Sequence, residues 1–161
     1  LARTPTVVVS SGVKSLLDVP ATHEALESLG VPVLGWRTDS LPLFYSRDGG
    51  PSVERIDTAE QVARLSAAHW SLGGQALLVA RPPDPELPAD EMTRFFDAAL
   101  VEAEREGVVG GAVTPFVLAH AHEASHGLTR DVNHQLIVDN AALAASISVA
   151  LENNKTGEGS A

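Results

Sequence analysis

Short apolar runs alternate with amphipathic stretches along the chain. Residues 6–10, 31–36 and 75–80 are apolar segments of strand length, and the first is rich in β-branched residues. Between them, apolar residues recur at helical spacing over residues 21–29 and 58–72, and each stretch ends at glycine. Strands that alternate with helices indicate βαβ units. The pattern therefore predicts an α/β fold of three layers, with a mostly parallel sheet and helices on both faces.

The second part of the chain is expected to be mainly helical. Four of the eight residues 81–88 are proline, so this segment is predicted to be a stiff loop after the third strand. A long amphipathic helix is expected over residues 90–106, where Gly107 ends it. Two further helices are expected over residues 116–125 and 132–151.

The domain boundaries follow from length and from the composition of the carboxyl terminus. We expect residues 1–151 to belong to one α/β domain, because 161 residues suffice for a single core. Residues 152–161 are polar and contain two glycines, so we expect a disordered tail. A strand begins within a few residues of Leu1, which is not a methionine, so we also expect an upstream half that this sequence does not contain.

Composition and charge narrow the functional classes. A net charge of −10 argues against a surface that follows the phosphates of nucleic acid. The chain has no cysteine, which excludes disulfides and thiolate chemistry. Uninterrupted apolar runs such as residues 75–80 are far shorter than the roughly 20 residues that span a bilayer. We therefore expect a cytoplasmic protein without nucleic-acid or membrane partners.

Charged residues follow the predicted strands at the edge where α/β sheets bind ligands. Lys14 follows the first strand, Arg37 and Asp39 the second, and Arg81 the third. Apart from Lys155 in the predicted tail, Lys14 is the only lysine. A lysine amine that is partly desolvated beside a buried strand is a candidate nucleophile for an aldehyde. A solvated loop lysine is the alternative.

The segment His122-Glu-Ala-Ser-His126 matches H-E-x-x-H, a motif that binds zinc when both histidines lie on one helix. A zinc hydrolase is therefore an alternative function. Gly127 follows directly, which places the predicted helix end at the second histidine and favours a structural role for both. Asn133 and Asn140 lie seven residues apart on the last predicted helix and can share a face, so each is expected to bond either a ligand or backbone.

Several segments together resemble the pseudouridine-5'-phosphate glycosidase family. They include Thr-Pro-Thr-Val-Val-Val-Ser-Ser-Gly-Val-Lys-Ser at residues 4–15 and Leu-Glu-Ser-Leu-Gly-Val-Pro-Val-Leu-Gly at residues 26–35. The resemblance continues through residues 38–45, 112–118 and 140–145, so it covers nearly the whole chain. The matched segments correspond to the carboxyl-terminal half of the family's usual chain.

This resemblance implies a function and roles for two residues. The family reversibly joins ribose 5-phosphate to uracil through a carbon–carbon glycosidic bond, in a reaction of the hydro-lyase type. By resemblance, Lys14 forms a Schiff base with the opened sugar, and Asn133 contacts the substrate. The family's catalytic glutamate, a second lysine and the aspartate that holds a divalent metal, typically Mn²⁺, are expected upstream of Leu1. No metal ligand is therefore expected here, this chain alone is expected to lack part of the active site, and a homotrimer is implied.

The chain departs from the family pattern around the predicted site. Ser11-Gly12, Ala80-Arg81-Pro82, His126-Gly127 and Thr129-Arg-Asp-Val132 stand where the family usually has other residues. These departures leave the acceptor open, since a C-glycosynthase that attaches ribose 5-phosphate to an aromatic natural product in antibiotic biosynthesis fits the same lysine. An inactive homologue kept as an interaction subunit is the alternative that is not an enzyme.

Overall fold

The computed structural model describes residues 1–15 and 17–158. Its strands are β1 (Val7–Ser10), β2 (Val33–Trp36), β3 (Glu54–Ile56) and β4 (Leu77–Ala80). Its helices are α1 (Val19–Ser28), α2 (Ala59–Ser71), α3 (Ala89–Arg105), α4 (Val113–Ala124), α5 (Leu128–Glu158) and the short 3₁₀ helix η1 (Gly110–Ala112). Except for β3 and η1, these elements lie where the apolar pattern predicts them.

The sheet has the strand order β1-β4-β2-β3, and its paired strands all run parallel. Val7 to Ser10 of β1 pair in register with Leu77 to Ala80 of β4, so the carboxyl ends of these strands lie side by side. The sequence did not predict β3, because its three residues, Glu-Arg-Ile, include two exposed charged side chains. Pairing with β2, rather than local pattern, makes this segment a strand.

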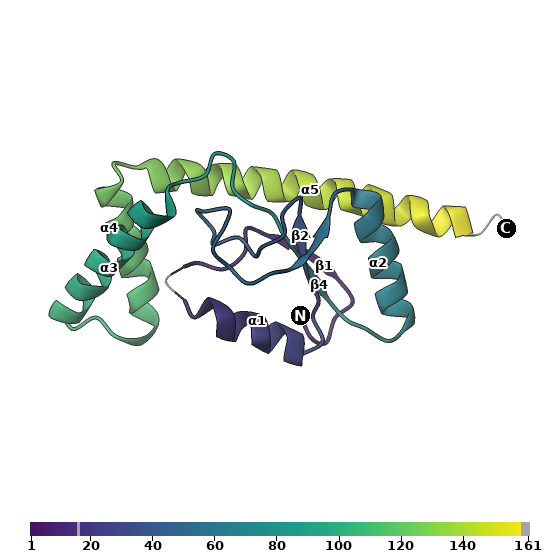
Figure 1. Ribbon diagram of the computed structural model, residues 1–161, viewed down its shortest axis with the longest axis horizontal. Coiled ribbons are helices and arrows are strands. Elements are labelled where there is room, and N and C mark those ends of the chain that lie inside the picture. Colours follow the sequence, from purple (N-terminus) through teal and green to yellow (C-terminus); the bar gives the residue numbers. More distant parts are fainter. Residues whose placement is uncertain (16, 159–161) are drawn as a thin grey trace.

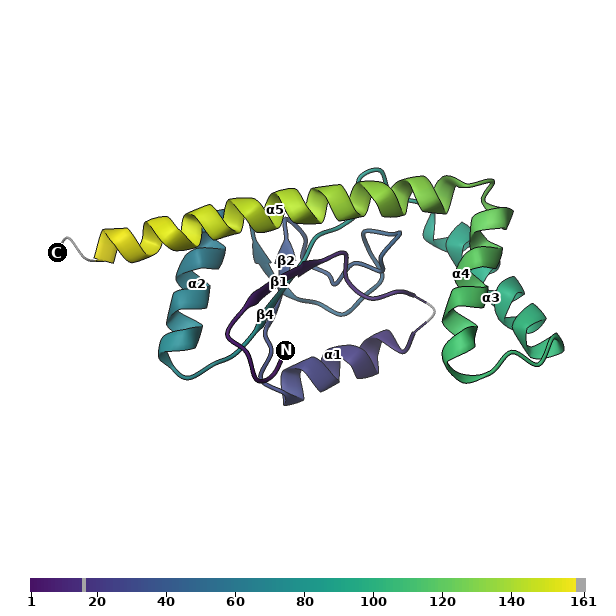
Figure 2. The same cartoon turned by 180° about the vertical axis from the view of Figure 1, so that it is seen from behind.

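Helices cover both faces of the sheet, as the sequence predicts. Helix α5 runs across one face together with α2, and α1 lies on the opposite face (Figures 1 and 2). The core on the α5 side contains Leu34, Ile56, Val62, Leu77, Val79, Leu143 and Ile147. The core on the α1 side contains Val13, Val19, Val31, Val33, Leu41, Ala76, Leu78 and Ala80. Side chains that alternate along β4 therefore fill two separate cores.

Local sequence signals set the ends of several helices. Thr58 and Gln61 form a complete capping box at the start of α2. Gly30, Gly73 and Gly107 follow the ends of α1, α2 and α3 with positive φ angles, and the next backbone amide bonds back into the helix. This arrangement is the Schellman motif, for which glycine is the preferred residue.

Helix α5 is longer than the sequence predicts at both ends. The prediction that residues 152–161 form a disordered tail is wrong for residues 152–158, which continue α5, and residues 159–161 lie outside the described part. Adding residues to an existing helix costs little, and Lys155 reaches Glu152 at 3.5 Å along the extension. Composition alone did not reveal this continuation.

One stretch of α5, Leu128–Thr156, is long and apolar enough to span a membrane, because an 18-residue window within it has a mean hydropathy of 1.2. This stretch was not predicted from the sequence, because polar residues interrupt its apolar positions. Leu143 and Ile147 pack in the core against the sheet. A long core helix meets the same criterion of length and composition, so this stretch carries little weight as a sign of a membrane span.

A third core lies at one end of the molecule and joins the helices α3, α4 and α5 (Figure 1). It contains Tyr45, Leu87, Met92, Phe96, Ala99, Val117, Ala121, Val132 and Leu136. Tyr45 belongs to the loop between β2 and β3, and its carbonyl accepts a hydrogen bond of 2.8 Å from the Leu87 amide. This loop therefore connects the sheet to the helical end.

Candidate functional site

The loop that carries Lys14 is held by the segment that follows β2. Gly12 pairs with Leu43 in an antiparallel bridge, and the Val13 amide donates to the Pro42 carbonyl at 3.1 Å. A side chain at Gly12 has no room, because a Cβ atom there would lie 1.8 Å from the Pro42 oxygen, and the φ angle is +83°. Glycine at this position allows the two backbones to meet, which fixes the start of the loop.

Lys14 lies against an aromatic side chain. Its Nζ is 5.4 Å from the centroid of the Phe44 ring, within the range of a cation–π contact. Phe44 has a φ of +69°, a strained conformation for an aromatic residue, and its amide donates to the Ser11 carbonyl at 3.1 Å. Within the described residues, no carboxylate lies within ion-pair distance of Lys14. The amine is therefore held in place without being neutralised by an acid.

Lys14 and Asn133, the two site residues predicted from the sequence, line the same pocket of about 330 Å³. The lining residues come from the Lys14 loop, the β2–β3 loop, α4 and the start of α5: Lys14, Phe44, Tyr45, Leu118, Ala119, His122, Thr129, Arg130 and Asn133. The fold therefore brings together a lysine and an asparagine that are far apart in sequence. Their roles in catalysis remain a prediction.

Tyr45 forms the buried floor between this pocket and the third core. It is 5% exposed, and its ring meets that of Phe44 edge to face at a centroid distance of 4.8 Å. Burial raises the pKa of the Tyr45 phenol above its usual value of 10.0. The hydroxyl therefore keeps its proton at neutral pH and can donate a hydrogen bond.

Asn140 supports the Lys14 loop from α5 but does not line the pocket. Its side-chain nitrogen donates to the hydroxyl of Ser11 at 2.9 Å, and Ser11 is 3% exposed. Asn140 and Asn133 thus face the same side of α5, as their spacing predicts, but with different partners. The sequence predicted that Asn140 bonds either a ligand or backbone, whereas it bonds a side chain.

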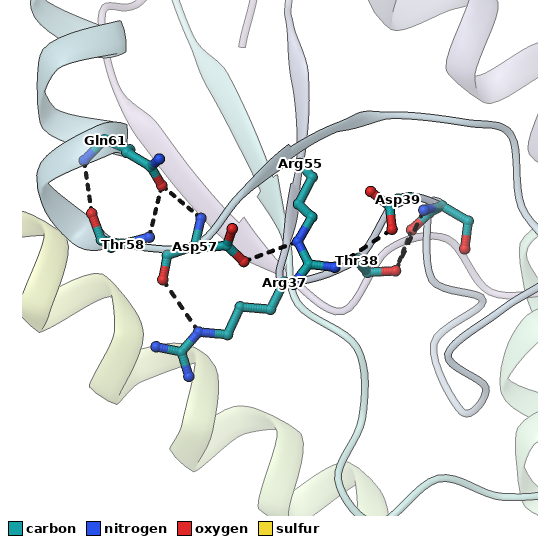
Figure 3. A network of polar contacts seen from close by, with 8 residues as sticks. Arg37, Thr38, Asp39, Arg55, Asp57, Thr58 and Gln61 are labelled. Atoms are coloured by element: carbon teal, nitrogen blue, oxygen red, sulfur yellow. Dashed lines mark hydrogen bonds and ion pairs between the residues drawn. The ribbon is translucent and has the colours of Figure 1, made fainter.

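The other charged residues at the strand ends are bound within the protein. Arg81 pairs with Asp139 of α5 at 3.0 Å, and its amide donates to the Ser10 carbonyl. Figure 3 shows Arg37 donating to the Asp57 carbonyl at 3.2 Å. These contacts join the carboxyl ends of the strands to neighbouring segments, and neither arginine lines the pocket of Lys14.

Figure 3 also shows how this network reaches the start of α2. Arg55 donates to the Asp57 carboxylate at 2.9 Å and to Asp39 at 3.5 Å. The hydrogen bond to Asp57 raises the pKa of the exposed Arg55 guanidinium. The amides of Asp57 and Thr58 donate to Gln61 at 2.7 and 3.0 Å. Asp39 therefore belongs to a surface network that orders the β3–α2 connection.

The two histidines of the H-E-x-x-H segment do not share a helix. Helix α4 ends at Ala124, and His126 lies beyond it with a φ of +51°. The His126 amide donates to the Glu123 carbonyl and the Gly127 amide to the His122 carbonyl, which is the Schellman motif of the other helix ends. The geometry therefore contradicts the zinc-hydrolase alternative, because its two ligands must project from one helical face.

The described residues contain no group of three or more His, Cys, Asp or Glu side chains placed to hold a metal ion. The described part of the chain therefore gives no fit for the Mn²⁺ that the family resemblance implies. The prediction placed its aspartate ligand upstream of Leu1, and that placement remains a prediction.

Most of the pocket wall was not predicted from the sequence. Phe44 and Tyr45 fell in a segment matched by resemblance only, and His122 was considered as a zinc ligand or as a structural residue at a helix end. Thr129 and Arg130 appeared as departures from the family pattern. These residues meet because α4 and α5 pack beside the β2–β3 loop around Tyr45. The adjacent aromatic residues Phe44 and Tyr45, two positions after Pro42, were the sequence signal that could have indicated this wall.

The known proteins that resemble this chain belong to one family. A family model described as indigoidine synthase A like protein matches residues 1–150. The chain is 45% identical to the pseudouridine-5'-phosphate glycosidase of Methylobacterium nodulans, covering 94% of this chain and 46% of that protein. It is 48% identical to the Salinispora tropica protein of the same name, covering 93% of this chain and 48% of that protein.

Solved structures show the same fold. The prealnumycin C-glycosynthase AlnA, in complex with ribulose 5-phosphate, matches 97% of this chain and 53% of its own with a TM-score of 0.90 at 33% identity. An indigoidine synthase A-like protein from Thermotoga maritima matches 92% of this chain and 50% of its own, with a TM-score of 0.79 at 37% identity.

The chain spans about half the length of the curated relatives it matches. The family model nevertheless matches nearly the whole chain, and the relatives and solved structures agree with it. The predicted resemblance is confirmed: this chain belongs to the pseudouridine-5'-phosphate glycosidase family, also described as indigoidine synthase A-like.

Proposed function

We propose that this chain supplies Lys14 and Asn133 to the active site of an enzyme that reversibly forms a C-glycosidic bond between ribose 5-phosphate and an acceptor. The observation that carries this proposal is the shared pocket of Lys14 and Asn133, in which Lys14 has no acidic partner among the described residues. The relatives named pseudouridine-5'-phosphate glycosidase make uracil the first acceptor to test.

Lys14 acts in this proposal as an amine nucleophile. Its nitrogen attacks the C1 aldehyde of ring-opened ribose 5-phosphate, and loss of water leaves a protonated imine. The acceptor carbon gives an electron pair to C1 and later loses its proton, while the imine electrons return to nitrogen. The sugar 4-hydroxyl then attacks C1, closes the ring and expels the Lys14 amine. The sum is one C-glycoside and one water from the two substrates.

The second candidate is a C-glycosynthase that uses an aromatic acceptor other than uracil. The likeness to AlnA favours it, because that enzyme is a prealnumycin C-glycosynthase and its complex holds ribulose 5-phosphate, an isomer of ribose 5-phosphate. Both candidates use the same lysine and sugar. They differ in the acceptor that the pocket admits.

Product analysis of the full-length protein tests this function. Ribose 5-phosphate is incubated with uracil or with an electron-rich phenol, and mass spectrometry detects a product equal to both substrates less water. Lys14→Ala should abolish product. Asn133→Ala should raise the KM for ribose 5-phosphate by about tenfold, the effect of losing one good hydrogen bond.

Lys155→Ala is the matched control, since Lys155 is exposed and, among the described residues, pairs only with its neighbour Glu152. It should leave the rate unchanged. Product with uracil supports the glycosidase, and product with the phenol alone supports the C-glycosynthase. A folded protein that makes no C-glycoside with either acceptor contradicts the proposal and favours a non-enzymatic interaction subunit.

The family resemblance also implies Mn²⁺ and a homotrimer for the full-length protein. We propose that the metal ligand, a catalytic glutamate and a second lysine lie outside this chain. Metal analysis and sedimentation of the full-length protein test the metal and the trimer.

A further inference from the structure

One wall of the Lys14 pocket is built from the junction between α4 and α5. His122 lies in the last turn of α4, and Thr129 and Arg130 lie in the first turn of α5. The Arg130 amide donates to the Gly127 carbonyl at 3.0 Å, and the Thr129 amide donates to the Ser125 hydroxyl at 3.3 Å. This junction fixes the backbone of the wall opposite the Lys14 loop.

The lining of this pocket is positive in a strongly acidic chain. The chain has a net charge of −10, yet none of the described residues that line the pocket is an aspartate or glutamate. Lys14 and Arg130 are both lining residues. Asp131, the acidic residue in the first turn of α5, does not line the pocket. Positive charge is therefore concentrated here against the average of the molecule.

Arg130 is available to a ligand. Its side chain is exposed, and within the described residues its guanidinium makes no hydrogen bond or ion pair. An arginine presents a planar fork of N–H donors that matches a phosphate or carboxylate. The start of α5 adds a partial positive charge from its backbone.

His122 adds a second donor. Its Nδ1 is buried and, in the part of the chain that the structure describes, has no hydrogen-bond partner. A neutral ring therefore favours the tautomer that leaves Nδ1 without a proton and places the proton on Nε2. Because His122 lines the pocket, Nε2 is then the ring nitrogen that can donate to a ligand.

We infer that Arg130, together with His122 and Thr129, binds an anionic oxygen group of the molecule that reacts at Lys14. This group is the phosphate of the sugar or an ionised oxygen of the acceptor. The identity of the reacting molecule rests on the proposed function, whereas binding of the anion does not depend on the imine chemistry. Lys14, Arg130 and His122 supply hydrogen-bond donors to the pocket. They favour a ligand that is rich in oxygen atoms able to accept hydrogen bonds.

Calorimetric binding to the full-length protein tests this inference. Ribose 5-phosphate, ribose and inorganic phosphate are titrated into the wild type, Arg130→Gln and Arg94→Gln. Arg94 is the control, because it is an exposed arginine on α3 outside the pocket, and its loss changes the net charge equally. Arg130→Gln should weaken binding of ribose 5-phosphate and phosphate by about tenfold or more, and binding of ribose by less than about twofold.

The remaining arms identify the source of the anion. If Arg130→Gln leaves ribose 5-phosphate binding unchanged but raises the KM for an ionisable phenol acceptor tenfold, the inference holds and the anion belongs to the acceptor. Equal behaviour of Arg130→Gln and Arg94→Gln towards both molecules overturns it. Lys14→Ala separates the two proposals, since it should still bind phosphate if the anion wall exists, even where no imine chemistry occurs.

Discussion

The side chain of Asn140 donates a hydrogen bond of 2.9 Å to the hydroxyl of Ser11, across 129 positions of sequence. Ser11 lies between β1 and the loop that carries Lys14, and its carbonyl accepts from the Phe44 amide. One residue of α5 thus holds the segment that positions both Lys14 and the aromatic ring beside it. We therefore expect Asn140 to act as a positioning residue for the proposed nucleophile.

Loss of the Ser11 hydroxyl should destabilise the fold. Ser11→Ala leaves the amide of Asn140 without its partner at a buried site, which costs about 1–3 kcal/mol in the free energy of unfolding. Urea denaturation followed by circular dichroism measures it. Ser146→Ala is the control, because the Ser146 hydroxyl is exposed and, within residues 1–15 and 17–158, bonds only its own helix at the Ala142 carbonyl. A Ser11→Ala protein as stable as Ser146→Ala contradicts the positioning role.

Substitution of Gly12 should be more damaging than substitution of a glycine with open space. Gly12→Ala places Cβ 1.8 Å from the Pro42 oxygen at a φ of +83°, so the two backbones must separate. We expect a loss of more than about 3 kcal/mol in the free energy of unfolding.

Gly30→Ala provides the comparison for Gly12, because it has a φ of +65° but no atom within 4 Å of the added Cβ. It should cost about 1 kcal/mol from backbone strain alone. Equal losses for the two variants, measured by the same denaturation, would show that the contact of the Lys14 loop with Pro42 is not required.

Replacement of His126 by glycine should stabilise the protein. His126 occupies, with a φ of +51°, the position that Gly30, Gly73 and Gly107 hold after the other helices. His126→Gly therefore removes backbone strain and should raise the free energy of unfolding by up to about 1 kcal/mol. The thermal unfolding midpoint should rise accordingly. A marked loss of stability, or of bound metal, would instead indicate a role for the H-E-x-x-H segment.

Tyr45 should make stability depend on alkaline pH. It is the only tyrosine of the chain, and burial raises its pKa above 10.0. The folded state therefore binds this proton more tightly than the unfolded state, so the free energy of unfolding should fall as pH rises from about 10 through the folded pKa. The near-ultraviolet absorbance of the phenolate reports this titration, and a midpoint at or below 10 would contradict the burial of Tyr45.

Sequence reasoning recovered the features that depend on local pattern. The βαβ alternation and the glycine stops are encoded within a few residues, and the structure has them. Strand β3 was missed because Glu54 and Arg55 lack an apolar pattern, and only pairing with β2 makes them a strand. The end of α4 near His126 was predicted from Gly127, and the structure ends this helix at Ala124.

The candidate site was only half accessible from the sequence. Lys14 was noticed as a rare lysine after a strand, whereas its neighbours in space, Phe44 and His122, come from elements that meet through tertiary packing. The pairing of Arg81 with Asp139 is also a long-range contact, so both strand-end arginines looked like ligand-binding residues until the structure gave their partners. Spacing along a chain does not report such contacts.

Borohydride trapping is the most direct test of the role of Lys14. The full-length protein is incubated with ribose 5-phosphate, reduced, digested and mapped by mass spectrometry. The account predicts one reduced pentose phosphate on the peptide that contains Lys14, no such adduct on the peptide of Lys155, and none at this site in Lys14→Ala. A wild-type protein that carries no adduct on Lys14, or that is modified equally on Lys155, would contradict it.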